Sequence, residues 1–309
     1  MPNCDGAKAD LQCAHWGASP KRDLMVSGLR IQQVETAVMV SVVVGSFDRL
    51  EYLVGTVDSI RRELEGVSRE IIVVDGGSTD GTIDWLVRQK DIVTILQHNR
   101  GSWEGKPIER RSWGYFMNLG FRAATGKYVC MLSDDSLVIP GAIRNGVRQF
   151  EDAARRAGAQ KLGGIAFFWR NWPEQEKYWV GVTFGNHVFI NHGLYLREAL
   201  EAVRYIDAES YFFYHADGDL SLRMWEAGYE TVAADNSFVE HHTHANQAVR
   251  RTNNERQPDD WATYEARWAA LGLPSEDWKF REFDDATRTA LRYWREPGGW
   301  VDRLLRRRR

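Results

Sequence analysis

The sequence contains few cysteines: Cys4, Cys13 and Cys130 are the only three in 309 residues. Their number is odd and no two of them have C-x-x-C spacing, which argues against a disulfide framework and against a zinc ribbon. The cysteine content therefore favours a reducing compartment, and we expect a cytoplasmic protein.

Long apolar runs and an excess of positive charge are also missing. No stretch approaches the roughly 20 residues that a helix needs to span a bilayer, and the N-terminal "MPNCDGAKADLQCAHWG" has acidic residues and no apolar core. We therefore expect neither secretion nor a transmembrane anchor. The formal net charge is -3, so we expect no nucleic acid partner.

Regular patterning begins at Val38, after an N-terminal extension of residues 1–37 without sustained periodicity. Apolar, β-branched runs alternate with segments of helical spacing up to about residue 135, which predicts a parallel sheet covered by helices on both faces. We therefore expect an open, mostly parallel α/β sheet in a domain over residues 38–245. Residues 246–309 read as a helical C-terminal extension with a basic tail.

In such a sheet, ligands bind beyond the carboxyl ends of the strands, so the residues after each apolar run matter most. The first is Asp75 in "IIVVDGGSTDGT". A carboxylate would repel a pyrophosphate placed directly on it, and the Walker A lysine position holds Thr82. Asp75 suits the donor groups of a nucleoside instead. The alternative is an Asx turn that links strand to helix.

A second cluster, "LSDDS", places Asp134 and Asp135 directly after the run "YVCML". Adjacent carboxylates repel each other unless a cation lies between them and a ligand. Mg²⁺ is commonly held by one or two carboxylates together with substrate phosphate oxygens. The cluster predicts a divalent-metal site, and a solvated turn with helix-capping acids is the alternative.

The third and fourth clusters are "HADGDL" and "VEHHTH". Asp217 or Asp219, among aromatic neighbours, could have the raised pKa of a general base that accepts a proton from a sugar hydroxyl. The alternative is that they are helix N-terminal acids. His241 and His242 could complete an oxygen-rich Mg²⁺ or Mn²⁺ shell. Each is otherwise an ordinary hydrogen-bonded histidine.

Four motifs in this order resemble the family 2 glycosyltransferases, over about residues 38–244. "VSVVVGSFDRLEYL" is similar to the family's opening strand and loop, and "IIVVDGGSTDGT" to its nucleoside-binding turn. "NLGFRAATGKYVCMLSDDS" resembles the run into its metal-binding motif, and "HADGDLSLRMWEAGY" resembles its catalytic-base segment. Two departures are Gly76 in place of a common second acid and Ala216 in place of the usual Glu.

The resemblance implies a GT-A fold and an inverting transfer of sugar from a nucleoside diphosphate sugar, with Mg²⁺ or Mn²⁺. It implies Asp217 as the catalytic base and Asp135 as the metal ligand, with His241 or His242 completing the shell. It implies a nucleotide-sugar site formed by Ser46, Asp48, Asp75, Ser78, Asn118, Asp134 and Asp219.

The acceptor would be a glycan, a polysaccharide or a lipid-linked saccharide. The tail "GGWVDRLLRRRR" predicts either a peripheral contact with an anionic membrane at its inner face or a solvated basic end.

Two other classes of function stay open at this point. A sugar nucleotidyltransferase needs a loop rich in glycine and arginine after the first strand, where "VGSFDRL" has a single glycine. A noncatalytic protein of the same fold could bind a nucleotide sugar or a carbohydrate, and Ala216 favours that alternative. The insertion 102–117, longer than the family norm, is expected to shape the donor or acceptor pocket.

Overall fold

The computed structural model describes residues 38–156, 161–242, 247–273 and 280–283. They belong to one compact unit, Ala37–Arg309. The expected N-terminal extension, the basic tail and His244 lie outside the described residues. Within the described part of the chain, no helix is both long and apolar enough to cross a membrane.

The predicted parallel sheet is present. The strands β1 (Val40–Ser46), β2 (Arg69–Asp75), β3 (Ile92–Leu96) and β6 (Tyr128–Ser133) are all parallel and lie in the order β6-β1-β2-β3. The β-branched side chains of β1, β2 and β6 are buried on both faces, as a sheet covered by two helical layers requires, whereas those of the edge strand β3 are partly or fully exposed. The expectation of an open, mostly parallel α/β sheet flanked by helices is confirmed.

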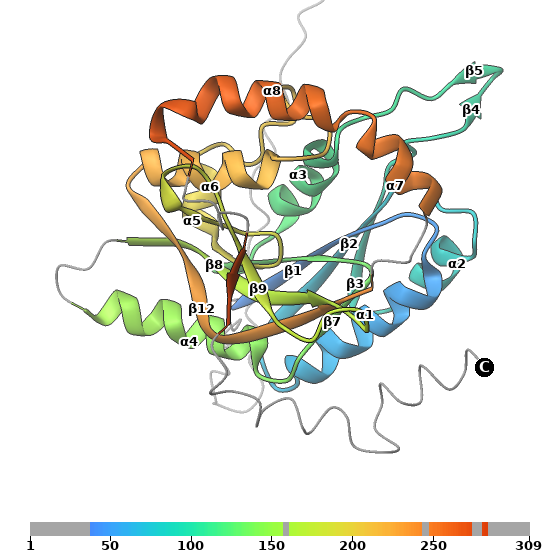
Figure 1. The fold of residues 1–309 in the computed structure, drawn as a ribbon. Helices are drawn as coiled ribbons and strands as arrows, with labels where there is room; N and C mark the ends of the chain where they lie inside the picture. Colours follow the sequence, from blue (N-terminus) through green and yellow to red (C-terminus); the bar gives the residue numbers. More distant parts are fainter. Residues whose placement is uncertain (1–37, 157–160, 243–246, 274–279, 284–309) are drawn as a thin grey trace, which may run out of the picture. The chain divides into compact units, whose positions relative to one another are not determined.

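Helices cover both faces of this half of the sheet (Figure 1). Val42 packs with α1 (Leu50–Glu63) on one face, whereas Val43 packs with α3 (Trp113–Ala123) on the other. Alternation along a strand produces this division, since successive side chains point to opposite faces. A Cβ on Gly120 would lie 2.3 Å from Val43 Cγ1. The small residue therefore lets α3 approach the sheet closely.

Beyond β6 the sheet continues in mixed directions, to eleven strands among the described residues. β11 (Gly193–Leu196) is antiparallel to β6 and to β8 (Lys161–Asn171). β12 (Tyr229–His241) runs parallel to β8 and antiparallel to β7 (Ser136–Val138), and its last residues lie beside the end of β6. β9 (Trp179–Val182) pairs with β8 and also with β10 (Val188–Phe189) and β13 (Phe280–Glu282), and β3 is the edge strand at the opposite end of the sheet.

The remaining elements connect or cover these strands. They are α2 (Thr82–Leu86), the hairpin of β4 (Ser102–Trp103) and β5 (Lys106–Pro107), α4 (Ala142–Arg155), η1 (Phe184–Asn186), α5 (Arg197–Ala202), α6 (Ala216–Glu226), α7 (Gln247–Asn254), α8 (Gln257–Trp268) and η2 (Ala269–Leu271). The insertion 102–117 thus forms the hairpin, a connection and the first residues of α3.

The C-terminal helix α8 is bonded into the domain rather than attached loosely. The carboxylate of Asp260, in its first turn, accepts hydrogen bonds from the backbone N–H groups of Phe212, Phe213 and Tyr214 at 2.7, 2.9 and 2.8 Å. These three residues lead into α6. The extension therefore fixes the loop that carries the expected catalytic base.

We predict that Asp260→Asn lowers the free energy of unfolding by about 2–3 kcal/mol, because an amide keeps only one acceptor oxygen and places its NH₂ group against at least one of the three N–H donors. Asp259→Asn, in the same helical turn but exposed, should change it by less than about 0.5 kcal/mol. Urea unfolding of both variants measures this. Equal losses in the two variants would contradict the role given to Asp260.

Candidate active site

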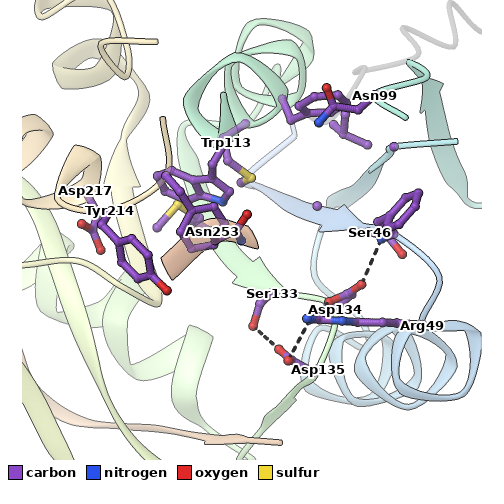
Figure 2. Close-up of a pocket in the computed structure, with 18 of the residues that line it drawn as sticks. Ser46, Arg49, Asn99, Trp113, Ser133, Asp134, Asp135, Tyr214, Asp217 and Asn253 are labelled. Atoms are coloured by element: carbon purple, nitrogen blue, oxygen red, sulfur yellow. Dashed lines mark hydrogen bonds and ion pairs between the residues drawn. The ribbon is translucent and has the colours of Figure 1, made fainter. Parts of the chain in front are cut away.

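A cleft of about 600 Å³ opens at the carboxyl ends of the parallel strands (Figure 2). Its walls come from the ends of β1, β2, β6 and β12, from the segments that follow β3 and precede β11, from α3, from the loop into α6, and from α7. Figure 2 shows Asp217 and Tyr214 on one side and Arg49, Asp134 and Asp135 on the other. The strand-end prediction thus located the cleft.

Asp134 and Asp135 are 3% and 2% exposed and share one cation. Arg49 Nη1 lies 2.8 Å from Asp134 Oδ1 and 2.9 Å from Asp135 Oδ2. Burial raises the pKa of Asp134 to about 6, although the Arg49 cation opposes this. The repulsion between the two carboxylates, which the sequence predicted, is therefore offset in this structure by Arg49, the residue directly before α1.

Asp135 has further partners that favour its charged form. Its Oδ1 lies 3.2 Å from His241 Nε2 and accepts a hydrogen bond from Ser133 Oγ at 2.6 Å. Burial opposes ionisation, but His241, Arg49 and Ser133 outweigh it and hold the pKa of Asp135 well below its usual range. Asp135 is thus a carboxylate ready to bind a cation.

His192 stands beside this group as a neutral donor or acceptor. Its Nε2 lies 3.1 Å from both Ser133 Oγ and Ser136 Oγ. Burial and the neighbouring His241 lower the pKa of His192 to about 3. The neutral His192 ring therefore holds the Ser133 hydroxyl, which in turn donates a hydrogen bond to Asp135, and it adds no charge to the cleft.

The two histidines predicted as metal ligands lie in different surroundings. His241 contacts Asp135, and its Nδ1 lies 3.1 Å from Asn171 Oδ1, which orients the ring. The His242 ring centroid lies 5.8 Å from that of Tyr52, and its backbone N–H donates to the Asp135 carbonyl oxygen at 2.8 Å. His241 lines the cleft and His242 does not.

The residues around Asp135 fit a divalent cation that a substrate helps to hold. Among the described residues, no group of three or more His, Cys, Asp or Glu side chains could hold a metal by itself. Asp135 and His241 nevertheless offer one oxygen and one nitrogen at the cleft wall, as Mg²⁺ or Mn²⁺ uses when phosphate oxygens supply other ligands. Arg49 is the cation that such a metal would have to displace.

Asp217 reaches the cleft from the first turn of α6. Burial raises the pKa of its carboxyl to about 6, although hydrogen bonds from the Gly218 N–H and the Asn191 side chain favour the ionised form. A carboxyl with this pKa is suited to accept a proton near neutral pH.

Ser46 is a predicted nucleotide contact that lines the cleft. Its hydroxyl is buried and has no hydrogen-bond partner among the described residues. Since buried hydroxyl groups are normally paired, this one is available to a ligand.

Three other predicted nucleotide contacts join the turns after β1 and β2 and do not line the cleft. The Asp75 carboxylate accepts hydrogen bonds from the N–H groups of Gly77 and Ser78 and from Ser78 Oγ, at 2.9, 2.7 and 2.6 Å. The Asp48 N–H donates to Ser78 Oγ at 2.8 Å, and Asp48 Oδ1 accepts from the Thr79 N–H at 2.6 Å. These bonds are those of the Asx-type turn kept as the alternative, and the nucleoside role of Asp75 stays a prediction.

Asn118 and Asp219 are buried polar residues with internal partners and do not line the cleft. Asn118 donates to the Ile206 carbonyl oxygen and accepts from the Ile206 N–H, at 2.8 and 3.0 Å. Asp219 accepts from Arg223 Nε at 2.6 Å and Trp268 Nε1 at 3.0 Å. In this structure Asn118 connects α3 to the segment after α5, and Asp219 connects α6 to α8.

The sequence did not point to several residues that line the cleft. Arg49 could have been suspected from its place in the short loop between the first strand and the first helix. His192, Asn191, Trp113, Asn253 and Asn254 follow no recognisable pattern, and α7 supplies the last two from outside the family motifs. Arg100 and Arg110 come from the two ends of the segment that contains the hairpin.

The model of Glycosyl transferase family 2 matches residues 41–204, more than half of the 309-residue chain. The chain belongs to this family and is a glycosyltransferase. A glycosyltransferase of Nostoc sp. (strain PCC 7120), itself uncharacterized, is 30% identical over 114 residues, which are 36% of this chain and 33% of that protein. This chain therefore spans a third of the length of that relative.

Solved structures share the fold. TarS of S. aureus has a TM-score of 0.54 and 13% identity over 77% of this chain and 40% of that chain. Residues 1–349 of the same protein, solved in complex with UDP-GlcNAc, have a TM-score of 0.53 and 13% identity over 76% of this chain and 70% of that chain. The mannosyltransferase PcManGT of Pyrobaculum calidifontis, solved in complex with GDP-Man and Mn²⁺, has a TM-score of 0.51 and 17% identity over 74% of this chain and 63% of that chain. These likenesses confirm the GT-A fold.

We predict that Arg49→Gln tightens Mn²⁺ binding at least about tenfold, because removing a cation next to the two carboxylates removes several kcal/mol of repulsion. The variant should also be less stable without metal, since a buried carboxylate pair loses its partner. Isothermal titration with Mn²⁺ measures the affinity, and Arg61→Gln, on the same helix but paired with exposed Asp91, is the control. Equal affinity in all three proteins would mean that Arg49 does not compete with metal.

Proposed function

We propose that this glycosyltransferase moves a sugar, with inversion, from a nucleoside diphosphate sugar to an acceptor hydroxyl, with the help of a divalent metal. The observation that carries the proposal is that one cleft contains both a candidate proton acceptor and a candidate metal-binding carboxylate pair. A carboxyl with a pKa of about 6, on Asp217, lies across the cleft from the carboxylate pair Asp134 and Asp135.

Asp217 is the catalytic base in this proposal. Its carboxylate accepts the proton of the acceptor hydroxyl while the oxygen attacks the anomeric carbon from the face opposite the leaving group. The bond between that carbon and the phosphate oxygen breaks, and the nucleoside diphosphate leaves with both electrons. The hydrogen bonds from the Gly218 N–H and from Asn191 hold the carboxylate in place.

Asp135 and His241 would hold Mg²⁺ or Mn²⁺, which offsets the charge that develops on the leaving diphosphate. PcManGT, a neighbour in fold, was solved with GDP-Man and Mn²⁺. Asp134 would then contact the donor, and Arg49, displaced from Asp135, would keep its ion pair with Asp134. His242, whose ring lies against Tyr52, orients the end of β12 through its backbone.

The nucleoside lies beside the end of β1 in this proposal. The unpartnered hydroxyl of Ser46 and the wall made by Val74 and Gly76 support this placement. Asp75 lies between those two residues, and the three hydrogen bonds that it accepts leave a carboxylate some remaining acceptor capacity. Asp48 and Ser78 shape the same pocket by joining the two turns.

The acceptor is a glycan, a polysaccharide or a lipid-linked saccharide. The aromatic residues Trp113 and Tyr214 line the acceptor side of the cleft near Asp217 (Figure 2) and offer faces for sugar rings. A membrane contact through the terminal arginines remains a proposal from the sequence, because those residues lie outside the described part of the chain.

We predict that UDP, GDP or dTDP raises the thermal midpoint of the protein and that Mn²⁺ increases the shift. The reason is that diphosphate oxygens and Asp135 complete the same metal shell. Differential scanning fluorimetry with each nucleotide, with and without Mn²⁺, measures this. No response to any nucleotide would remove the donor assignment.

We predict that Asp217→Asn lowers the transfer rate by about 10²–10⁴-fold, because an amide cannot accept the proton. Nucleotide affinity should be retained, since the residue lies across the cleft from the carboxylate pair. Release of nucleoside diphosphate in the presence of acceptor measures the rate. Asp84→Asn, an exposed acid in the first turn of α2, is the control, and equal turnover in both variants would remove the base assignment.

The same assignment predicts a dependence on pH. A raised pKa means that the carboxyl keeps its proton up to about pH 6, so the rate should fall as the pH drops through about 6. Burial raises the pKa of the neighbouring Tyr195 and Tyr264 far above neutrality, so they do not titrate there. If the residual activity of Asp217→Asn keeps this acid limb, another group, such as Asp134, is responsible.

A further inference from the structure

Two arginines from the ends of the hairpin-containing segment line the cleft without an acidic partner. Arg100 lies over the ring of Phe47 and Arg110 over the ring of Phe212, each with Cζ 4.8 Å from the ring centroid. Both side chains are partly buried. Stacking on a ring holds a guanidinium group in one orientation and leaves its N–H edge available to a ligand.

No carboxylate lies within ion-pair distance of either group among the residues that the structure describes. Arg110 Nη2 donates to Asn253 Oδ1 at 2.5 Å. Burial lowers the pKa of both arginines, and the proximity of Arg100 and Arg256 lowers that of Arg110 further. Like charges are therefore gathered at this side of the cleft, and the acids that act on them, Asp48 and Glu255, form no ion pair with either arginine.

The other arginines of the cleft, Arg49 and Arg111, form ion pairs with carboxylates. Arg111 lies 3.0 Å from Glu109, and Arg49 bridges Asp134 and Asp135. Partial burial of a charge costs free energy unless an opposite charge compensates it. Arg100 and Arg110 therefore lack the compensation that their neighbours have.

The backbone holds the two residues in place. Asn99 Oδ1 accepts a hydrogen bond from the Arg111 N–H at 2.5 Å, and the Ile108 N–H donates to the Gly101 carbonyl oxygen at 2.9 Å. These bonds close the base of the segment, so Arg100 and Arg110 stay at the cleft while the hairpin of β4 and β5 extends away (Figure 1).

We propose that Arg100 and Arg110 form an anion subsite that binds a phosphate oxyanion of a ligand in the cleft. Guanidinium groups bind phosphate oxygens through paired, charge-assisted hydrogen bonds. The carboxylate side of the cleft carries two acids against one arginine and repels an anion that no metal ion bridges to it, so such an oxyanion binds at Arg100 and Arg110 instead. The source is either the diphosphate of the donor or a phosphate on the acceptor, and only this identity rests on the proposed function.

The experiment compares the wild type with Arg100→Gln, Arg110→Gln and the double variant. Arg122→Gln is the matched control, because Arg122 also stacks on a ring, Tyr205, with Cζ 5.4 Å from its centroid, but is exposed on α3 and does not line the cleft. The probes are UDP, GDP, uridine, guanosine and inorganic pyrophosphate. Isothermal titration gives the dissociation constants, and thermal midpoints without ligand show that each variant is folded.

We expect each substitution to weaken diphosphate binding about tenfold, the effect of one lost charge-assisted hydrogen bond, and the control to change nothing. If UDP or GDP weakens while uridine and guanosine do not, the donor supplies the oxyanion. If nucleotide binding is unchanged but pyrophosphate binding at saturating nucleotide is lost, the acceptor supplies it.

If neither nucleotide nor pyrophosphate binding differs between the wild type and the double variant, the subsite does not exist. A wild type that binds no nucleotide would overturn the donor assignment under the proposed function. Pyrophosphate would then still test the two arginines, so the two failures are distinguishable.

Discussion

The structure of the cleft depends on the cost of burying two consecutive carboxylates at the end of β6. Asp134 and Asp135 are almost fully buried, and such a pair is stable only with cations and hydrogen-bond donors around it. Arg49 lies in the loop between β1 and α1, directly before α1, and His241 is the last residue of β12; both contact the pair. The pairing of β1 with β6, and of β12 with β7 directly after the two acids, is therefore what makes the acidic motif tolerable.

The charge of the cleft is arranged in two regions that suit a ligand with separate parts. Asp134, Asp135 and Arg49 form an acidic region, in which His192 stays neutral because burial and His241 lower its pKa to about 3. Arg100 and Arg110 supply positive charge from the hairpin-containing segment. A ligand that carries phosphate gains from the positive region directly, and from the acidic region only when a cation lies between its phosphate oxygens and the carboxylates.

The sequence predicted most of the fold because the parallel strands are short apolar, β-branched runs that alternate with segments of helical spacing, and because acidic residues follow these runs. It also predicted that Asp134, Asp135, Asp217 and His241 would share a site, since parallel strands end at one edge. It could not predict that Arg49 lies between the two acids, or that His192 supports Ser133, because these contacts join segments distant in sequence. Asn253 and Asn254 were missed because α7 follows no family motif.

Some residues that the sequence assigned to the donor site form hydrogen bonds within their own turns, which shows a second limit of prediction from sequence. Asp75, Asp48 and Ser78 lie in glycine-rich or acidic turns, and such turns use carboxylates and hydroxyls to satisfy their own N–H groups. Gly77, at φ 91°, has a left-handed backbone that glycine favours. Sequence patterns alone do not separate a residue that shapes a pocket from one that contacts its ligand.

Ala216 seemed to favour loss of activity, because an acid usually precedes the base in this family. In the structure Ala216 is 1% exposed, belongs to the core cluster and does not line the cleft, whereas Asp217 does. The cleft therefore loses no carboxylate through this substitution. A buried acid there would also need its own partner in a core already occupied by aliphatic and aromatic side chains. The alanine is explained by packing, and Asp217 keeps its position because Asp260 fixes the loop before α6 through three backbone hydrogen bonds.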